Sequence, residues 1–175
     1  ALQNGAAKVF AIDVGTNQLD WKLRSHPQVV NMEKTNIKVV TEEMLGEKVD
    51  LVSTDVSFIS VLKIIPAVRS ILKEDGAMAI LIKPQFEAGR EEVGKKGVVR
   101  DPKVHLEVLE SFLAFVPGAG YTVMGLDYSP IKGPEGNIEY LGYLRKGSHD
   151  APQLDPAAVV AQSHGALAHG KESGV

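Results

Sequence analysis

Four charged side chains stand where predicted strands begin or end, and together they could move a proton. Asp55 follows the apolar run of residues 50–54, and Lys83 ends the run of residues 77–82. Glu139 lies early in the last predicted strand, and Asp13 ends the first one. In open α/β sheets, ligands bind at the carboxyl ends of the strands. A lysine whose pKa is lowered by burial and cationic neighbours can act as a general base, whereas acids beside it would oppose that shift and orient the ammonium.

Each of these residues also has a simpler interpretation. Asp is a preferred N-cap, so on its own segment Asp55 is more readily interpreted as the cap of a following helix. Lys83 needs an acidic partner if it is buried, and a structural ion pair would satisfy that need. Glu139 is equally compatible with an exposed position on an edge strand, and Asp13 with an ordinary turn. The residues alone therefore leave both interpretations open.

The composition limits the classes of protein to be considered. The chain has 175 residues, 44% hydrophobic and 23% charged, which is typical of one globular domain. Its net charge of −3 argues against a protein that binds nucleic acid through its overall charge alone. The absence of cysteine excludes disulfides, thiolate metal sites and a cysteine nucleophile, and no metal site is expected. With no apolar run near the roughly 20 residues of a membrane span and no visible signal peptide, a cytoplasmic location and no membrane partner are expected.

Strands and helices alternate along the chain, which predicts a doubly wound α/β sheet. The expected strands are residues 8–14, 29–33, 50–54, 77–82, 121–128 and 137–145. The expected helices are residues 16–24, 59–72, 101–115 and 156–164, with a mobile polar loop over residues 86–100. A short loop joins the last two strands, so they should pair as an antiparallel hairpin. We expect a domain over residues 1–146, followed by a linker, a short helix and a frayed end within residues 147–175.

The helix predictions rest on capping residues and on the spacing of apolar side chains. Asp101 followed by a proline, and Asp155 followed by another, are typical helix starts. Thr41 is expected to cap a short turn. Residues 59–72 carry an apolar stripe at helical spacing, within which Pro66 should cause a kink or a break. Gly76 is expected to end that helix.

Four stretches carry a resemblance to a known family. They are IDVGTNQLDWKLR, TDVSFIS, LIKPQFE and GNIEYL, in that order. Together they resemble the TlyA-type haemolysins, which are similar to FtsJ-like ribosomal RNA 2′-O-methyltransferases. The resemblance covers most of residues 1–146. It implies a Rossmann-like methyltransferase sheet, mostly parallel with an antiparallel C-terminal hairpin, and S-adenosylmethionine as cofactor.

The resemblance also implies roles for individual residues. Asp55, Lys83 and Glu139 match the last three members of the family's Lys-Asp-Lys-Glu tetrad, in which the second lysine deprotonates a ribose 2′-hydroxyl. The implied cofactor residues are Asp13 with Val14 at the ribose, Asn36 near the adenine and Asp55 near the methionine. Ribosomal RNA, or a ribosomal subunit, is the implied partner, and the basic loop of residues 87–100 would help to hold it.

The family pattern has parts that this chain does not show. The glycine-rich first cofactor motif, the first tetrad lysine and an S4-like RNA-binding domain would all precede residue 1. We therefore expect a sheet that is incomplete at its N-terminus, with edges that a second copy could cover. Two alternatives to the enzyme are a haemolysin-like membrane-active protein and a methyltransferase fold used only for binding.

Overall fold

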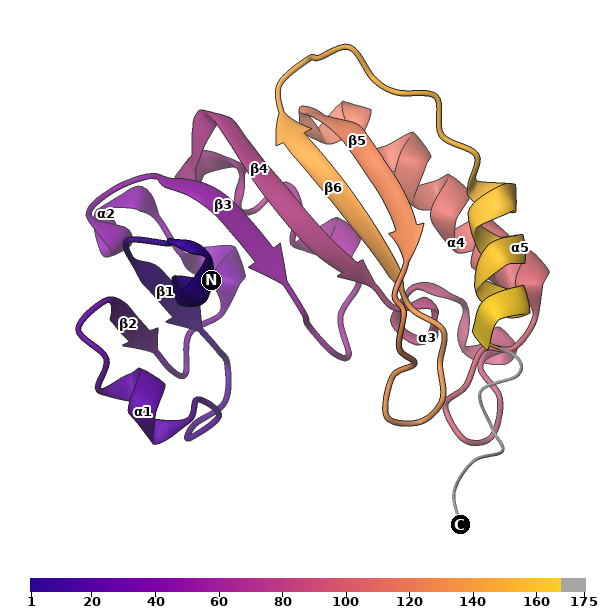
Figure 1. The fold of residues 1–175 in the computed structure, drawn as a ribbon, viewed down its shortest axis with the longest axis horizontal. Helices are drawn as coiled ribbons and strands as arrows, with labels where there is room; N and C mark the ends of the chain where they lie inside the picture. Colours follow the sequence, from indigo (N-terminus) through magenta and orange to yellow (C-terminus); the bar gives the residue numbers. More distant parts are fainter. Residues whose placement is uncertain (168–175) are drawn as a thin grey trace. The chain divides into compact units, whose positions relative to one another are not determined.

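The computed structural model of the chain describes residues 1–167 (Figure 1). The chain divides into two compact units, residues 1–48 and residues 49 onward, and each is described by itself. The end predicted to fray, residues 169–175, lies outside the described residues. Among the described residues, no helix is both long enough and apolar enough to cross a bilayer.

The first unit is built on two parallel strands. Strand β1 (Val9–Ile12) pairs with β2 (Val29–Met32), as the apolar runs predicted. A 3₁₀ turn, η1 (Leu2–Asn4), precedes them and ends at Gly5, whose φ of 91° lies in the left-handed region. The short elements η2 (Ile37–Val39) and α2 (Glu42–Leu45) follow, and the predicted Thr41 cap accepts a hydrogen bond from the Met44 backbone N–H at 3.3 Å.

The predicted helix of residues 16–24 is wrong over its first half. The helix, α1, spans only Trp21–Arg24. Its N-cap is Asp20, whose carboxylate accepts from the Lys22 backbone N–H at 2.9 Å. An N-cap residue has non-helical backbone angles, so this capped start excludes the preceding residues from the helix.

The second unit contains a four-stranded sheet in the order β3-β4-β6-β5. Its strands are β3 (Val49–Thr54), β4 (Leu72–Ile82), β5 (Tyr121–Tyr128) and β6 (Tyr140–Lys146). Strands β3 and β4 are parallel, whereas β6 runs antiparallel to both β4 and β5. The predicted α/β fold with a C-terminal antiparallel hairpin is confirmed. Strand β6 is an inner strand, which bears on the position of Glu139.

Strand β4 contains a bulge that the sequence did not predict. Val49 pairs with Leu72 but Leu51 pairs with Ala77, so β4 carries extra residues opposite β3. Gly76 lies inside this strand and does not end a helix. A Cβ on Gly76 would lie 2.8 Å from the Lys73 carbonyl oxygen, so only glycine lets the bulge close on itself.

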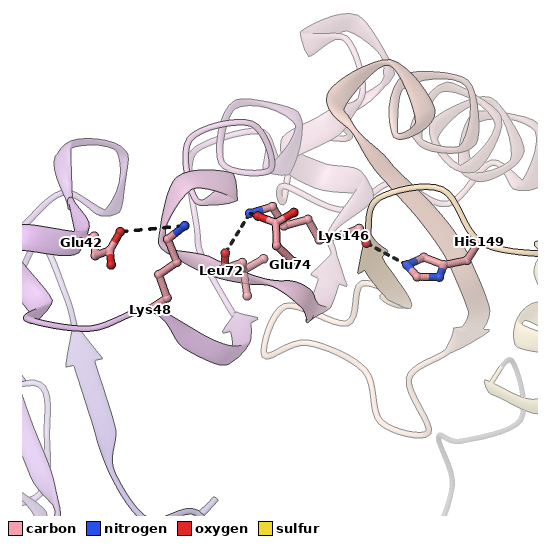
Figure 2. Close-up of polar contacts among 6 residues, drawn as sticks. All are labelled: Glu42, Lys48, Leu72, Glu74, Lys146 and His149. Atoms are coloured by element: carbon pink, nitrogen blue, oxygen red, sulfur yellow. Dashed lines mark hydrogen bonds and ion pairs between the residues drawn. The ribbon is translucent and has the colours of Figure 1, made fainter.

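A buried lysine from the neighbouring strand fixes this bulge. Lys146 is 4% exposed and donates through Nζ to the Leu72 carbonyl oxygen at 2.8 Å. It also pairs with the exposed carboxylate of Glu74 at 3.3 Å (Figure 2). The Lys146 carbonyl contacts the His149 ring at 2.8 Å. Figure 2 also shows the Glu42–Lys48 ion pair of the first unit.

The predicted helix of residues 59–72 is wrong. Two 3₁₀ turns, η3 (Val61–Lys63) and η4 (Arg69–Ile71), occupy this stretch with turns between them. Pro66 has no N–H to donate and its ring clashes with a helical carbonyl four residues earlier, so a continuous α-helix cannot pass through it. Most of the predicted apolar stripe is nevertheless buried, namely Val61, Ile65, Val68, Ile71 and Leu72, whereas Leu62 is only half-buried.

Two helices cover one face of the four-stranded sheet and lie side by side (Figure 1). They are α4 (Pro102–Phe115) and α5 (Pro156–Leu167), both capped as predicted by Asp101 and Asp155. A 3₁₀ turn, η6 (Pro117–Ala119), leads from α4 to β5. The predicted domain end at residue 146 stays a prediction, although α5 beyond it packs on α4.

The loop predicted over residues 86–100 has more structure than expected. It begins in α3 (Pro84–Glu87) and contains the 3₁₀ turn η5 (Arg90–Glu92). Its last part is anchored, because Val98 and Val99 are buried. Figure 1 shows α3, the β5–β6 loop and the loop after β3 at the same end of the sheet.

Candidate active site

Lys83 and Asp55 form an ion pair at the carboxyl ends of two neighbouring strands. The ladder between β3 and β4 ends at Thr54 and Ile80, and Asp55 follows it directly. Lys83 Nζ lies 2.7 Å from Asp55 Oδ1. It also donates to Ser57 Oγ at 3.4 Å. The Lys83 side chain is 13% exposed against 73% for Asp55, so the ammonium is held at the edge of the core with its carboxylate facing outward.

The interpretation of Asp55 as a helix cap is wrong. The first helical turn after it is η3, whose N-cap is Ser60. Ser60 Oγ accepts from the Leu62 backbone N–H at 3.2 Å and itself donates to Glu87 Oε2 at 2.6 Å. The carboxylate of Asp55 is therefore left to Lys83.

Glu139 and Lys83 lie just beyond the same end of the β4–β6 ladder. The last pair of the ladder is Ile82 with Tyr140, so Lys83 follows β4 and Glu139 precedes β6. Among the described residues, the ion pair of Lys83 is with Asp55 and not with Glu139. Glu139 is 7% exposed and its Oε1 accepts from Gln85 Nε2 at 3.2 Å. The predicted strand of residues 137–145 begins later, at Tyr140, so Glu139 precedes β6 and is not part of it. The alternative of an exposed position is also wrong, because this carboxylate is buried.

Glu87 connects the loop after β3 with the helix after β4. Its two carboxylate oxygens accept from Ser60 Oγ at 2.6 Å and from the Val61 backbone N–H at 2.8 Å. Burial raises the pKa of Glu87, although both hydrogen bonds oppose that shift. The segment that carries Asp55 is thereby joined to the segment that carries Lys83.

The loop after β3 that begins with Asp55 also carries an exposed aromatic ring. Phe58 is 91% exposed and has a φ of 63°, which is unfavourable for a bulky side chain. Its ring contacts that of Phe86, with centroids 5.0 Å apart. Strained residues of this kind concentrate at functional sites. This strain was not predictable from the sequence, because phenylalanine is not a residue that favours positive φ.

The first unit contains the other predicted residues, Asp13, Val14 and Asn36. Asp13 follows β1, is exposed, and accepts from the Gly15 backbone N–H through Oδ1 at 2.7 Å. Its second carboxylate oxygen has no hydrogen bond within the described residues, so it fits the two hydroxyls of a ribose. Val14 is exposed, and the Asn36 amide oxygen caps η2 by accepting from the Lys38 N–H at 3.0 Å. The amide NH₂ of Asn36 thus faces outward as a donor.

A second polar cluster is buried where α4, α5 and β6 meet. His105 is fully buried, and its Nε2–H donates to the Val99 carbonyl oxygen at 2.9 Å. His105 Nδ1 lies 2.8 Å from the Tyr140 hydroxyl and 3.1 Å from His164 Nε2. Burial lowers the pKa of His105 and that of His164, while it raises the pKa of Tyr140 to about 12. The sequence showed only an amphipathic helix here and gave no sign of a buried histidine pair.

This pair predicts how stability depends on pH. Below the ordinary histidine value of 6.5, the unfolded chain binds protons that the folded chain excludes, so the free energy of unfolding should fall as pH falls from 6.5. Urea unfolding between pH 5 and 8 measures it. The raised pKa of Glu87 has the opposite effect, because above pH 4.5 it makes the free energy of unfolding fall as the pH rises. The variant His164→Asn isolates the histidine part and should flatten the dependence; an unchanged slope in that variant would contradict this account.

The model of the FtsJ-like methyltransferase family matches residues 1–146, which include all the residues described above except His164. The chain belongs to this family. S-adenosylmethionine is the cofactor of FtsJ-like methyltransferases, and the exposed Asp13 carboxylate fits its ribose. The predicted family, fold and cofactor are confirmed, whereas the roles of individual residues stay predictions.

Individual members of the FtsJ-like family are similar over most of the chain. It is 45% identical over 173 residues to YqxC of Bacillus subtilis, a candidate rRNA methyltransferase, covering 95% of this chain and 62% of that protein. It is 42% identical over 144 residues to the 16S/23S rRNA (cytidine-2′-O)-methyltransferase TlyA of Mycobacterium tuberculosis. This match covers 82% of this chain and 54% of that protein. A solved structure of a candidate haemolysin from Streptococcus thermophilus superposes with a TM-score of 0.90 at 46% identity. This superposition covers 98% of this chain and 63% of that protein. The chain thus spans less than two thirds of these relatives.

Proposed function

We propose that the protein transfers a methyl group from S-adenosylmethionine to a ribose 2′-hydroxyl of ribosomal RNA. Membership of the FtsJ-like family supports methyl transfer, and the similarity to TlyA supports this acceptor. The observation that carries the proposal is the Lys83–Asp55 pair, 2.7 Å apart at the carboxyl ends of neighbouring strands. Ligands of open α/β sheets bind at that edge.

In this proposal Lys83 is the general base. In its deprotonated form, Nζ of Lys83 would accept the proton of the 2′-hydroxyl as the ribose oxygen forms its new bond to the methyl carbon. Asp55 would fix the position of Nζ, and Glu139, which directly precedes β6, would act from the same end of the ladder. When bound, S-adenosylmethionine would supply the methyl group of its sulfonium, with the sulfur as the leaving group. General bases of this kind contribute roughly 10²- to 10⁴-fold to rate.

The cofactor residues are proposed from the chemistry of their free groups. The exposed carboxylate of Asp13 would accept from the ribose hydroxyls, and Val14 beside it would contact the adenosine. The free amide NH₂ of Asn36 would donate to the adenine. Asp55 is additionally proposed to lie near the methionine part.

Phe58 is proposed as a stacking surface for a base of the RNA. Single-stranded bases are bound by stacking on exposed aromatic side chains. The Phe58 ring is exposed, strained in its backbone and supported from one side by Phe86. A ring held in this way near Lys83 would place the adjoining ribose beside the base.

Replacing Phe58 with glycine should separate this function from folding. Glycine accepts the φ of 63° without strain, so the free energy of unfolding should stay equal or rise. Loss of one stacked base costs about 1–3 kcal/mol, or roughly 5- to 150-fold in RNA affinity. Filter binding of rRNA fragments and urea unfolding measure the two effects. Val39→Gly, at an exposed apolar residue of the first unit, is the control, and equal RNA affinity in both variants would refute the stacking role.

The proposed function itself is tested with the chain extended to the length of its relatives, beside the 175-residue chain. Each is incubated with ribosomal subunits and S-adenosylmethionine carrying a labelled methyl group. A label in RNA that blocks alkaline cleavage at one nucleotide supports 2′-O-methylation. Labelling without such protection means methylation elsewhere, and no labelling by either protein overturns the proposal. Lysis of protein-free liposomes by the unlabelled protein would favour the membrane-active alternative.

A further inference from the structure

Gln85 is the single hydrogen-bond donor to the Glu139 carboxylate among residues 1–167. Gln85 is in α3, two residues after Lys83, and its Nε2 lies 3.2 Å from Glu139 Oε1. A buried carboxylate needs such a donor. Lys83 is the N-cap of α3 but makes no capping hydrogen bond with its side chain, which is directed to Asp55. The N-cap residue of α3 and the second residue of this helix thus each contact one of the two carboxylates.

The orientation of the Gln85 amide follows from chemistry. A carboxylate only accepts hydrogen bonds, so the NH₂ half of the amide must face Glu139. The carbonyl half, Oε1, is then buried, and no donor reaches it within the described residues. One half of the side chain is left without a partner while the other half holds Glu139. The Gln85 amide is therefore oriented to donate to Glu139, although its carbonyl oxygen is left without a hydrogen-bond donor among the described residues.

The same carboxylate oxygen is also confined by the β5–β6 loop. A Cβ on Gly133 would lie 2.7 Å from Glu139 Oε1, so the backbone of the β5–β6 loop approaches the carboxylate directly. The Glu139 carbonyl accepts from the Ser129 backbone N–H at 2.8 Å, which fixes the main chain. Between Gly133 and Gln85 the carboxyl group has little freedom to rotate.

We propose that Gln85 is a positioning residue, which holds the Glu139 carboxylate in place at the end of the β4–β6 ladder where Lys83 also lies. This inference rests on the proposed function, in which Lys83 receives the 2′-hydroxyl proton. Gln85 itself touches neither substrate nor cofactor in this role. Without its amide, the carboxylate would lose its hydrogen-bond donor and turn away from the end of the ladder that it shares with Lys83.

The hydrogen bond is tested first, without any activity measurement. The Gln85 carboxamide resonances in a ¹⁵N-labelled chain are assigned by their loss in Gln85→Leu. In the native chain they should exchange slowly with water, and in Glu139→Leu they should shift and exchange rapidly. Resonances that do not respond to Glu139→Leu would overturn the proposal whether or not the protein methylates RNA.

Kinetics of the extended protein test the consequence. Gln85→Leu should lower kcat by about ten- to a hundred-fold with KM for RNA and cofactor unchanged. Gln85→Glu places two carboxylates face to face, which cannot both be ionised but can share a proton. Its kcat relative to the native protein should therefore rise as pH is lowered from about 8 to 6. Gln153→Leu, at an exposed glutamine, is the control.

These outcomes separate the two proposals. A native protein that methylates RNA together with a Gln85→Leu variant of unchanged kcat would overturn the positioning role alone. An equal loss in Gln85→Leu and Gln85→Glu at every pH would show a merely structural role and overturn it too. A native protein that methylates no RNA would overturn the proposed function, and the resonance experiment would then decide the Gln85 contact by itself.

Discussion

Lys83→Met in the extended protein is expected to lower methyl transfer to ribosomal RNA by about a thousand-fold, within the range of a lost general base. Methionine keeps the length and apolar stem of lysine but cannot accept a proton. Lys83 is mostly buried but its partner Asp55 is mostly exposed, so the carboxylate left behind can be hydrated. The fold should therefore survive, and single-turnover transfer of a labelled methyl group measures the loss.

A lysine from the same two strands gives a matched control. Lys73 pairs with Asp50 at 2.9 Å, but both side chains are exposed and the pair lies near the opposite end of β3. Lys73→Met should leave the rate unchanged, since exposed ion pairs contribute little. Asp55→Asn should lower the rate while leaving the affinity for RNA intact. Full activity of Lys83→Met would rule out this lysine as the base.

Phe112→Ala should cause the largest loss of stability, about 3–5 kcal/mol in the free energy of unfolding. Phe112 is 2% exposed and lies between α4 and the sheet. Its ring fills the space above Gly142 of β6, where a built Cβ would lie 2.8 Å from the ring. Such a loss is a large part of the roughly 5–15 kcal/mol that stabilises a domain. Denaturant unfolding followed by circular dichroism measures it.

Two further variants make this prediction specific. Phe115→Ala, three residues later on α4 and less buried, should cost clearly less. Gly142→Ala should cost about 1–3 kcal/mol by overpacking against the ring. In the double variant Phe112→Ala with Gly142→Ala, the second cost should vanish because the added methyl enters the space that the ring left. Additive costs would show that these two residues do not contact one another.

The strands show how far local pattern can predict this fold. Residues 77–82 form a continuous apolar run, and they lie in β4, which is paired on both edges. The caps Asp101 and Asp155 were predictable because an N-cap hydrogen bond spans only two or three residues. Residues 59–72 were wrongly predicted because apolar spacing describes burial, which was right, whereas Pro66 determined the backbone.

The candidate site also has features that the sequence predicts and features that depend on the tertiary structure. The sequence by itself determined which side chains follow the strands, because strand ends are marked by a change from apolar to polar residues at Asp55 and Lys83. Only the tertiary structure decided that these two groups are 2.7 Å apart and that Glu139, directly before the inner strand β6, is buried beside Gln85. Strand order and register bring together Asp55 and Lys83, 28 positions apart, and Gln85 and Glu139, 54 positions apart, and no local pattern encodes them. The same reason hid the His105–His164 pair, which exists only because α5 packs against α4.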